Sequence, residues 1–236
     1  MLRLLFGEQP KEWTGISLDT VQLIERFGLR TTEIADRLPE HSEKFRTYAI
    51  WAEGLLRSLD ELEQSCFAAK RYAELIRHNH MDELSDEEIL SYNRHVYFDK
   101  NAYIRVFALL DKLGTLLNHL LKLRTERIKA HFSYFTVLRN LRENHLHMDL
   151  MKPLNELKER SQVAMSRLRN RRNLEIHQMN AELKDDLNQS LANGGARRTI
   201  EDLIANMADL EQSLDMVVGS LNHSFRYACN WLRNYD

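Results

Sequence analysis

Residues 97–123 read YFDKNAYIRVFALLDKLGTLLNHLLKL, and this stretch decides the fold. Its apolar side chains fall on nearly every side of a helix: Val106, Phe107, Leu109, Leu110, Leu113, Leu116, Leu117, Leu120 and Leu121. A helix that is hydrophobic all round is generally buried on all sides. The sequence therefore predicts a central helix over 97–123, with the other helices packed around it.

Two further segments, 41–77 and 199–232, carry apolar residues at alternating steps of three and four, which is the spacing of an α-helical core stripe. Few prolines occur, and no run of alternating β-branched residues has the length of a strand. With a further helical region over 153–191, the pattern predicts an all-α protein. We expect an up-and-down bundle of four to five long helices with short N-terminal helices.

The ends of these helices are predicted from proline and glycine. Pro153 suits the first turn of a helix that runs towards Arg167, and the next helical segment continues to about Leu191. Asn193-Gly194-Gly195 is the clearest stop signal in the chain. These signals place the last two helices on either side of residues 193–195.

The N-terminal part of the chain is expected to be organised differently from the rest. One short helix is predicted to end near Gly28, and a second to end before Pro39. We therefore divide the chain into an N-terminal helical extension, residues 1–40, and a helical bundle, residues 41–236.

The distribution of charge limits the possible partners. The net charge of −2 at pH 7 argues against a uniformly basic surface for tight nucleic-acid binding. Basic residues nevertheless gather in one segment, where a single anion, Glu159, accompanies these cations: Lys158, Arg160, Arg167, Arg169, Arg171 and Arg172. A local basic patch is therefore expected at residues 158–172.

Cysteine content and hydropathy indicate the compartment. Cys66 and Cys229 are too few for a zinc site or a disulfide framework, and they fit a reducing environment. No apolar run approaches the length needed to cross a bilayer. The expected location is the cytoplasm.

One stretch indicates chemistry: residues 168–178, which read LRNRRNLEIHQ. The planar guanidinium of Arg172 suits a phosphate, and the imidazole of His177 can exchange a proton near neutral pH. On a helix, Asn173 and His177 share a face, whereas Arg172 lies about 140° round from His177. The long side chain of Arg172 can still reach the same point, and Arg171 flanks it.

Arg172-Asn173-x-x-x-His177, with apolar Ile176 before the histidine, resembles the Arg-x4-6-His signature of the HEPN superfamily. The resemblance implies a small, usually dimeric helical bundle. Active members are metal-independent endoribonucleases that need no cofactor, and many are toxins or defence effectors.

Applied to this chain, the resemblance implies that Arg172 and His177 are the catalytic pair and that Asn173 supports them. The basic residues before the motif, Arg167, Arg169 and Arg171, are then the expected contacts to RNA phosphates. The expected partners are a second copy of the chain in a homodimer, single-stranded RNA, and a neutralising antitoxin or other protein.

The loose form of the motif also fits other places in the chain: Arg71 with His78, Arg124 with His131, and Arg142 with His147. The stricter form has one competitor, Arg139-Asn140-x4-His145, in which polar Asn144 precedes the histidine. Whether this pair or Arg172 with His177 is the functional one stays open. A metal site at His145 and His147 is not expected, because the two residues would lie about 160° apart on a helix.

Two polar residues of the predicted central helix are candidates for a supporting role. A carboxylate or amide behind a histidine can orient its ring, and Asp111 or Asn118 could do so for His177. The simpler interpretation places Asp111 and its neighbour Lys112 at the solvated edge of the helix.

The functional alternatives belong to different classes. As an enzyme, the protein would cleave single-stranded RNA by attack of the substrate's own 2′-hydroxyl. As a binding module, the same dimeric bundle would hold RNA, a nucleotide or an acidic protein without cleaving it. As a purely structural dimer, it would leave Arg172 and His177 as ordinary surface groups.

Overall fold

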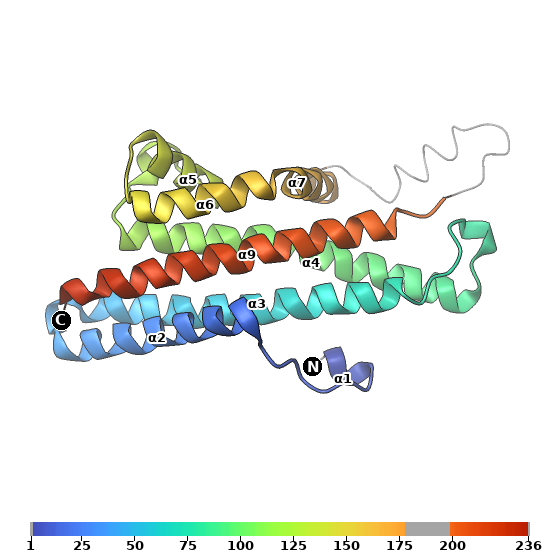
Figure 1. Cartoon of the computed structure of the whole chain (residues 1–236), viewed down its shortest axis with the longest axis horizontal. Coiled ribbons are helices and arrows are strands. Elements are labelled where there is room, and N and C mark those ends of the chain that lie inside the picture. Colours follow the sequence, from blue (N-terminus) through green and yellow to red (C-terminus); the bar gives the residue numbers. More distant parts are fainter. Residues whose placement is uncertain (1, 178–198, 236) are drawn as a thin grey trace. The chain divides into compact units, whose positions relative to one another are not determined.

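The computed structural model describes residues 2–177 and 199–235, and for His177 it describes the backbone alone. Figure 1 shows a chain built from helices. Their bounds are α1 Leu2–Leu5, α2 Gly15–Arg37, α3 Ser42–Ala73, α4 Asp86–Leu120, α5 Tyr134–Glu143, α6 Met148–Arg160, α7 Gln162–His177 and α9 Leu203–Trp231. Short 3-10 turns occur at Pro39–His41, Met81–Glu83, Thr125–Arg127 and Leu232–Tyr235.

The predicted all-α class is confirmed. Within residues 2–177 and 199–235, extended pairing is limited to one isolated bridge between His80 and Thr199. In the same ranges, no helix is both long and apolar enough to cross a membrane. The predicted stop at 193–195 and the end of the helical region near Leu191 lie outside the described residues.

The central helix is longer than predicted, because α4 begins at Asp86 rather than near Tyr97. Ser85 and Glu88 form a reciprocal cap: the Ser85 amide donates to Glu88 Oε2 at 3.0 Å, and the Glu88 amide donates to Ser85 Oγ at 3.3 Å. Hydrogen bonds from the Ser85 and Arg77 amides lower the pKa of Glu88 to about 2. The acidic segment that precedes the predicted helix therefore contains the start of α4.

Residues 15–37 form one helix, α2, instead of the two predicted short ones. Helix α2 runs through Gly28, because its buried residues keep the helical spacing on both sides of the glycine: Thr20, Leu23, Ile24, Phe27, Thr31, Ile34 and Ala35. The Phe27 ring packs edge-on against Phe225 at 5.2 Å between centroids. Burial of this stripe outweighs the low helix propensity of a single glycine.

The predicted start of a helix at Pro153 is wrong. Helix α6 begins at Met148, so Pro153 lies inside it. The helix ends at Arg160, and Ser161 separates it from α7. His147 precedes α6 in the left-handed conformation with φ 46°. The loop therefore ends five residues before Pro153, where the helix was predicted to begin. Packing of Leu150, Met151, Leu154 and Leu157, all buried in α6, compensates for the hydrogen bond that proline cannot donate.

Contacts divide the chain into two compact units. Unit 1 comprises residues 1–10, 62–104 and 162–213, and unit 2 comprises residues 11–61, 105–161 and 214–236. Helices α3, α4 and α9 each contribute one part to each unit. The predicted division into residues 1–40 and 41–236 is not tested by this grouping and stays a prediction.

Unit 2 has its core around Tyr134, which is fully buried at the start of α5. The Tyr134 hydroxyl donates to Ser220 Oγ at 3.0 Å, and its amide donates to Asp111 Oδ1 at 2.9 Å. Helix α4 approaches this tyrosine at Gly114, where an added Cβ would lie 2.9 Å from the Tyr134 Cα. The crossing of α4 and α5 therefore requires a residue without a side chain at position 114.

Unit 1 contains α1, the end of α3, the start of α4, helix α7 and the start of α9, and polar contacts join several of these helices. Ser65 of α3 donates to Asn101 of α4 at 2.9 Å, and Lys70 of α3 pairs with Glu211 of α9 at 2.8 Å. Helix α7 is joined to α4 and to α9 by ion pairs described below. Within the described part of unit 1, α7 thus lies against two partners, α4 and α9.

The close approach at Gly114 predicts opposite effects for two glycine substitutions. Gly114→Ala should lower the free energy of unfolding by about 1–3 kcal/mol, because the backbone of Tyr134 cannot move aside cheaply. Gly54→Ala is the matched control, since nothing lies within 4 Å of its added Cβ, and it should raise stability by roughly 0.5–1 kcal/mol. Urea unfolding followed by circular dichroism measures both, and equal effects would contradict the packing described.

Candidate functional site

One face of α7 is tied to its neighbours by charge. Arg167, Arg171 and Glu175 follow one another at steps of four and therefore lie along one stripe of the helix. Arg167 contacts Asp209 of α9 through two nitrogens, with Nε 2.7 Å from Oδ2. The Asp209 carboxylate is only 4% exposed, so this pair anchors the beginning of the stripe.

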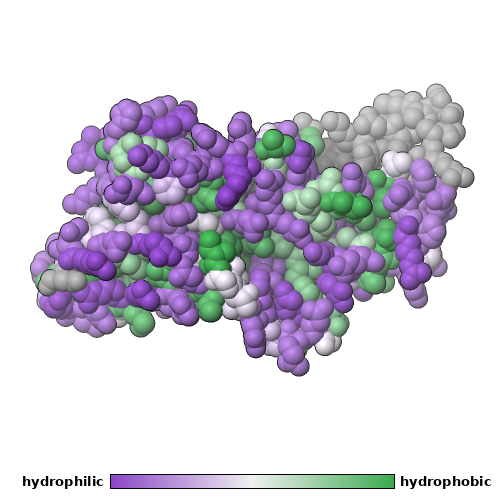
Figure 2. All heavy atoms as spheres, in the orientation of Figure 1, coloured by the Kyte–Doolittle hydropathy of each residue, from purple (hydrophilic) through white to green (hydrophobic). Residues whose placement is uncertain are grey.

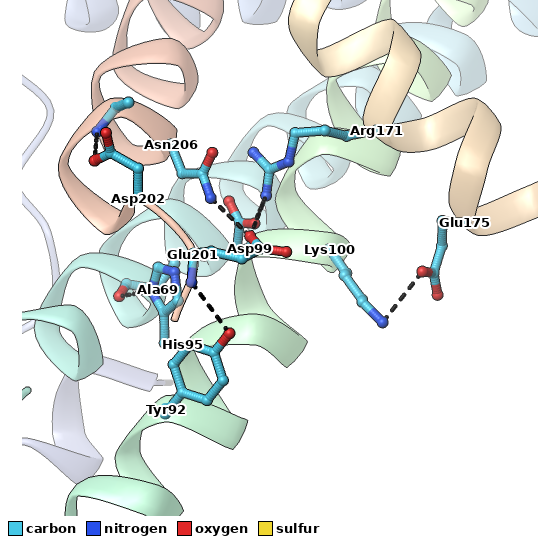
Figure 3. A network of polar contacts seen from close by, with 11 residues as sticks. Ala69, Tyr92, His95, Asp99, Lys100, Arg171, Glu175, Glu201, Asp202 and Asn206 are labelled. Atoms are coloured by element: carbon cyan, nitrogen blue, oxygen red, sulfur yellow. Dashed lines mark hydrogen bonds and ion pairs between the residues drawn. The ribbon is translucent and has the colours of Figure 1, made fainter. Parts of the chain in front are cut away.

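Arg171 is held in the interior of unit 1 (Figure 3). Its Nη2 donates to Asp99 Oδ2 of α4, and the Asp99 side chain is 2% exposed. The guanidinium also lies 4.9 Å from the centre of the Tyr103 ring and 3.8 Å from Glu201. Burial lowers the pKa of Arg171, but a guanidinium starts so far above neutrality that it remains charged.

The third residue of the stripe has the opposite polarity. Glu175 accepts from Lys100 Nζ at 3.1 Å, and both side chains are partly exposed, at 30% and 22%. Figure 3 shows this pair next to the Arg171–Asp99 contact, with α4 supplying Asp99 and Lys100. Helix α7 is therefore fixed to α4 on both sides of residues 172–173.

Arg172 and Asn173 lie between these anchors and are both half-buried. The Arg172 Nη2 donates to Asn173 Oδ1 at 2.8 Å, so the first two residues of the predicted motif interact directly. His177 ends α7, and its side chain lies outside the described residues. The backbone places residues 173 and 177 one helical turn apart, as the sequence predicts.

The three arginines predicted to bind phosphate differ in their surroundings. Arg167 and Arg171 already face carboxylates, which compete with any phosphate for the same donors. Arg169 is exposed on α7. Their predicted role in RNA binding stays a prediction.

The two residues predicted to stand behind His177 have other partners. Asp111 accepts from the Tyr134 amide at the start of α5, and Asn118 donates to Glu126 at 3.0 Å. The Asn118 carbonyl also accepts from the Thr125 amide at 2.9 Å. Both therefore stabilise turns in unit 2, whereas α7 belongs to unit 1, and their predicted role stays untested.

The competing pair Arg139 and His145 occupies a different setting. Asn140 is buried and donates to the Leu123 carbonyl at 3.1 Å, so the residue that completes the competing motif supports a loop. His145 is exposed after the end of α5, in the left-handed conformation with φ 52°. The competing motif thus has an interior asparagine and a histidine outside the helix.

Neither His95 nor Asp99 was among the predicted site residues, because the predicted helix began at residue 97 and did not include His95. His95 is fully buried, and its Nδ1 lies 2.9 Å from the Ala69 carbonyl. A carbonyl only accepts, so Nδ1 carries the proton and Nε2 is left as an acceptor. Nε2 has no hydrogen-bond partner in the described part of the chain.

A pocket of about 720 Å³ also lies in unit 1, at the beginning of α9. In Figure 2 a group of apolar residues covers this part of α9, where Ile204 is 85% exposed. The charged residues that line the pocket are one cation and four carboxylates: Lys70, Glu74, Glu201, Asp202 and Glu211. Because the carboxylates outnumber the single cation, the pocket is unsuited to a phosphate backbone, and α7 is the better candidate for contact with RNA.

Comparison with protein families was made with the whole sequence, and a family model matches most of it. A family model described as Cthe2314-like HEPN matches residues 51–229, which include all of α7. Neither the curated proteins nor the solved structures contain a significant match.

Burial of His95 predicts a dependence of stability on pH. Burial lowers the pKa of His95 below its usual 6.5, and Arg171 opposes its protonation further, although the Ala69 carbonyl and Glu201 act the other way. The neutral ring therefore stabilises the fold fully above about pH 6.5, and this contribution is lost as the pH falls below that value.

The test is His95→Asn, in which the amide can still donate to Ala69 but cannot titrate. Between pH 7 and 5 the variant should lose stability less steeply than the wild type, by up to about 1.4 kcal/mol per pH unit. Urea unfolding at three pH values measures the slopes. His147 and His223 also have lowered pKa values through burial, so the comparison is always with the wild type. Exposed His131→Asn is the control, and equal slopes for both variants would contradict the prediction.

Proposed function

The chain belongs to the Cthe2314-like HEPN family, and on this premise we propose that it is an endoribonuclease that cleaves single-stranded RNA. The observation that carries the proposal is the motif Arg172-Asn173-x-x-x-His177 at the end of α7, inside the matched region. Arg172 and Asn173 already interact, and the ion pairs of Arg171 and Glu175 hold the helix on either side.

The proposed chemistry uses the substrate's own nucleophile. His177 takes the proton of the 2′-hydroxyl as O2′ attacks the adjacent phosphorus, and the bond to the 5′-oxygen breaks. An imidazolium returns a proton to that leaving oxygen. Arg172 donates to the phosphorane oxygens, whose negative charge increases in the transition state. The products are a 2′,3′-cyclic phosphate and a 5′-hydroxyl.

Asn173 and Arg169 have supporting roles in this scheme. The Asn173 carbonyl accepts from one end of the Arg172 guanidinium, which orients the other donors. Arg169 is exposed on the same helix and is the proposed contact to a neighbouring phosphate. In a homodimer, a twofold pair of His177 residues would divide the roles of base and acid. A neutralising protein partner would then act by covering this end of α7.

A second candidate function is a binding module of the same fold that does not cleave. It is supported by the carboxylate partners of Arg167 and Arg171, which leave less positive charge for a transition state. The two functions differ in a simple experiment with single-stranded RNA in EDTA. Cleavage supports the nuclease, and retarded but intact RNA in a gel supports the binding module.

The nuclease proposal predicts that Arg172→Ala and His177→Ala each lower the cleavage rate by at least about 10²-fold, because each removes a group that acts in the transition state. Helicity and oligomeric state should not change. His145→Ala is the matched control, since this histidine is exposed outside α7, and it should leave the rate within twofold. Full activity in either of the first two variants would exclude the assignment, and loss only in His145→Ala would move the site to the competing motif.

A further inference from the structure

The motif on α7 is bracketed by two ion pairs of opposite polarity. Arg171 pairs with Asp99, and Glu175, one turn later, pairs with Lys100. Asp99 and Lys100 are adjacent residues of α4, so one short segment of that helix pairs with Arg171 and with Glu175, one turn apart on α7. Residues 172 and 173 lie within this turn.

The reversed polarity specifies one register between α4 and α7. If α7 slid by four residues, about 6 Å, Glu175 would come to the place of Arg171 and face Asp99. Two carboxylates in a buried position repel each other strongly. The arrangement therefore selects one axial position of α7 and one rotation about its axis.

The two pairs differ in strength because they differ in burial. Asp99 is 2% exposed, so water cannot replace Arg171 as its partner. The ring of Tyr103, one turn further along α4, has its centre 4.9 Å from the Arg171 guanidinium. It further restricts the positions that this guanidinium can take. Lys100 and Glu175 are partly exposed, so their ion pair adds little stability and mainly fixes the orientation of α7.

We infer that Asp99, through Arg171, and Lys100, through Glu175, are positioning residues that hold Arg172 and Asn173 in place for the proposed RNA cleavage. The inference rests on the proposed function. A displacement of a catalytic group by about 1 Å can cost about 10²-fold in rate, so the register of α7 matters for the chemistry.

The experiment compares kcat and KM for a single-stranded RNA in four variants. Asp99→Asn should lower kcat at least about tenfold and change KM less than twofold, because it removes the buried carboxylate that holds Arg171 against α4. Lys100→Glu should also lower kcat, since it places two carboxylates together. The double exchange Lys100→Glu with Glu175→Lys restores the pair and should recover most of the activity. Lys70→Ala removes the exposed pair with Glu211 in the same unit and should change neither constant.

Two results would overturn the inference: normal kcat in Asp99→Asn, or failure of the double exchange to rescue Lys100→Glu. Each protein is checked by circular dichroism, and if Asp99→Asn does not fold, the exchange of the partly exposed pair decides. Arg172→Ala is measured alongside. If Arg172→Ala keeps full activity, the proposed function fails and the positioning role fails with it. If Arg172→Ala is inactive while Asp99→Asn is normal, the positioning role alone is wrong.

Discussion

The buried carboxylate of Asp99 is the constraint on which the candidate site depends. A carboxylate that is 2% exposed requires a charged partner, and in unit 1 that partner is Arg171. Satisfying Asp99 therefore brings one particular residue of α7 against one particular point of α4. The neighbouring residues, Arg172 and Asn173, take their places as a consequence.

The same constraint explains why so polar a helix packs at all. Helix α7 has few apolar residues, and three of them, Ala164, Met165 and Leu168, are buried in its first half. Its second half is held by ion pairs instead of by an apolar stripe. Ion pairs of this kind specify orientation better than they add stability, because desolvation offsets much of their attraction. Orientation matters most at the end of α7, because this end carries the charged motif.

Much of the fold was predictable because its core is apolar and periodic. The buried stripes of α3, α4 and α9 repeat at helical spacing, and residues 97–123 correctly indicated a buried helix. The ends of the helices were predicted less well. Gly28 and Pro153 suggested boundaries that burial of flanking residues overrides, whereas the Ser85–Glu88 cap marked a true boundary that was not used.

The candidate site was predictable only as a local motif. Arg172, Asn173 and His177 are adjacent in the chain, so their spacing could be read directly. Asp99 and Glu201 lie far from them in sequence, and only the packing of α4 and the start of α9 brings these carboxylates to Arg171. Asp111 and Asn118 were chosen as polar residues of a predicted buried helix, but capping of α5 and of the turn at Thr125 also selects polar residues at such positions.

The end groups of the RNA fragments test the central claim most directly, because they record which oxygen attacked the phosphorus. Mass spectrometry of a short single-stranded RNA after incubation with the protein in EDTA should find 2′,3′-cyclic phosphate and 5′-hydroxyl ends. The same RNA with 2′-deoxyribose at the cleaved position should stay intact. Fragments with 3′-hydroxyl and 5′-phosphate ends, or cleavage of the deoxy-substituted RNA, would contradict an arginine and histidine mechanism at the end of α7.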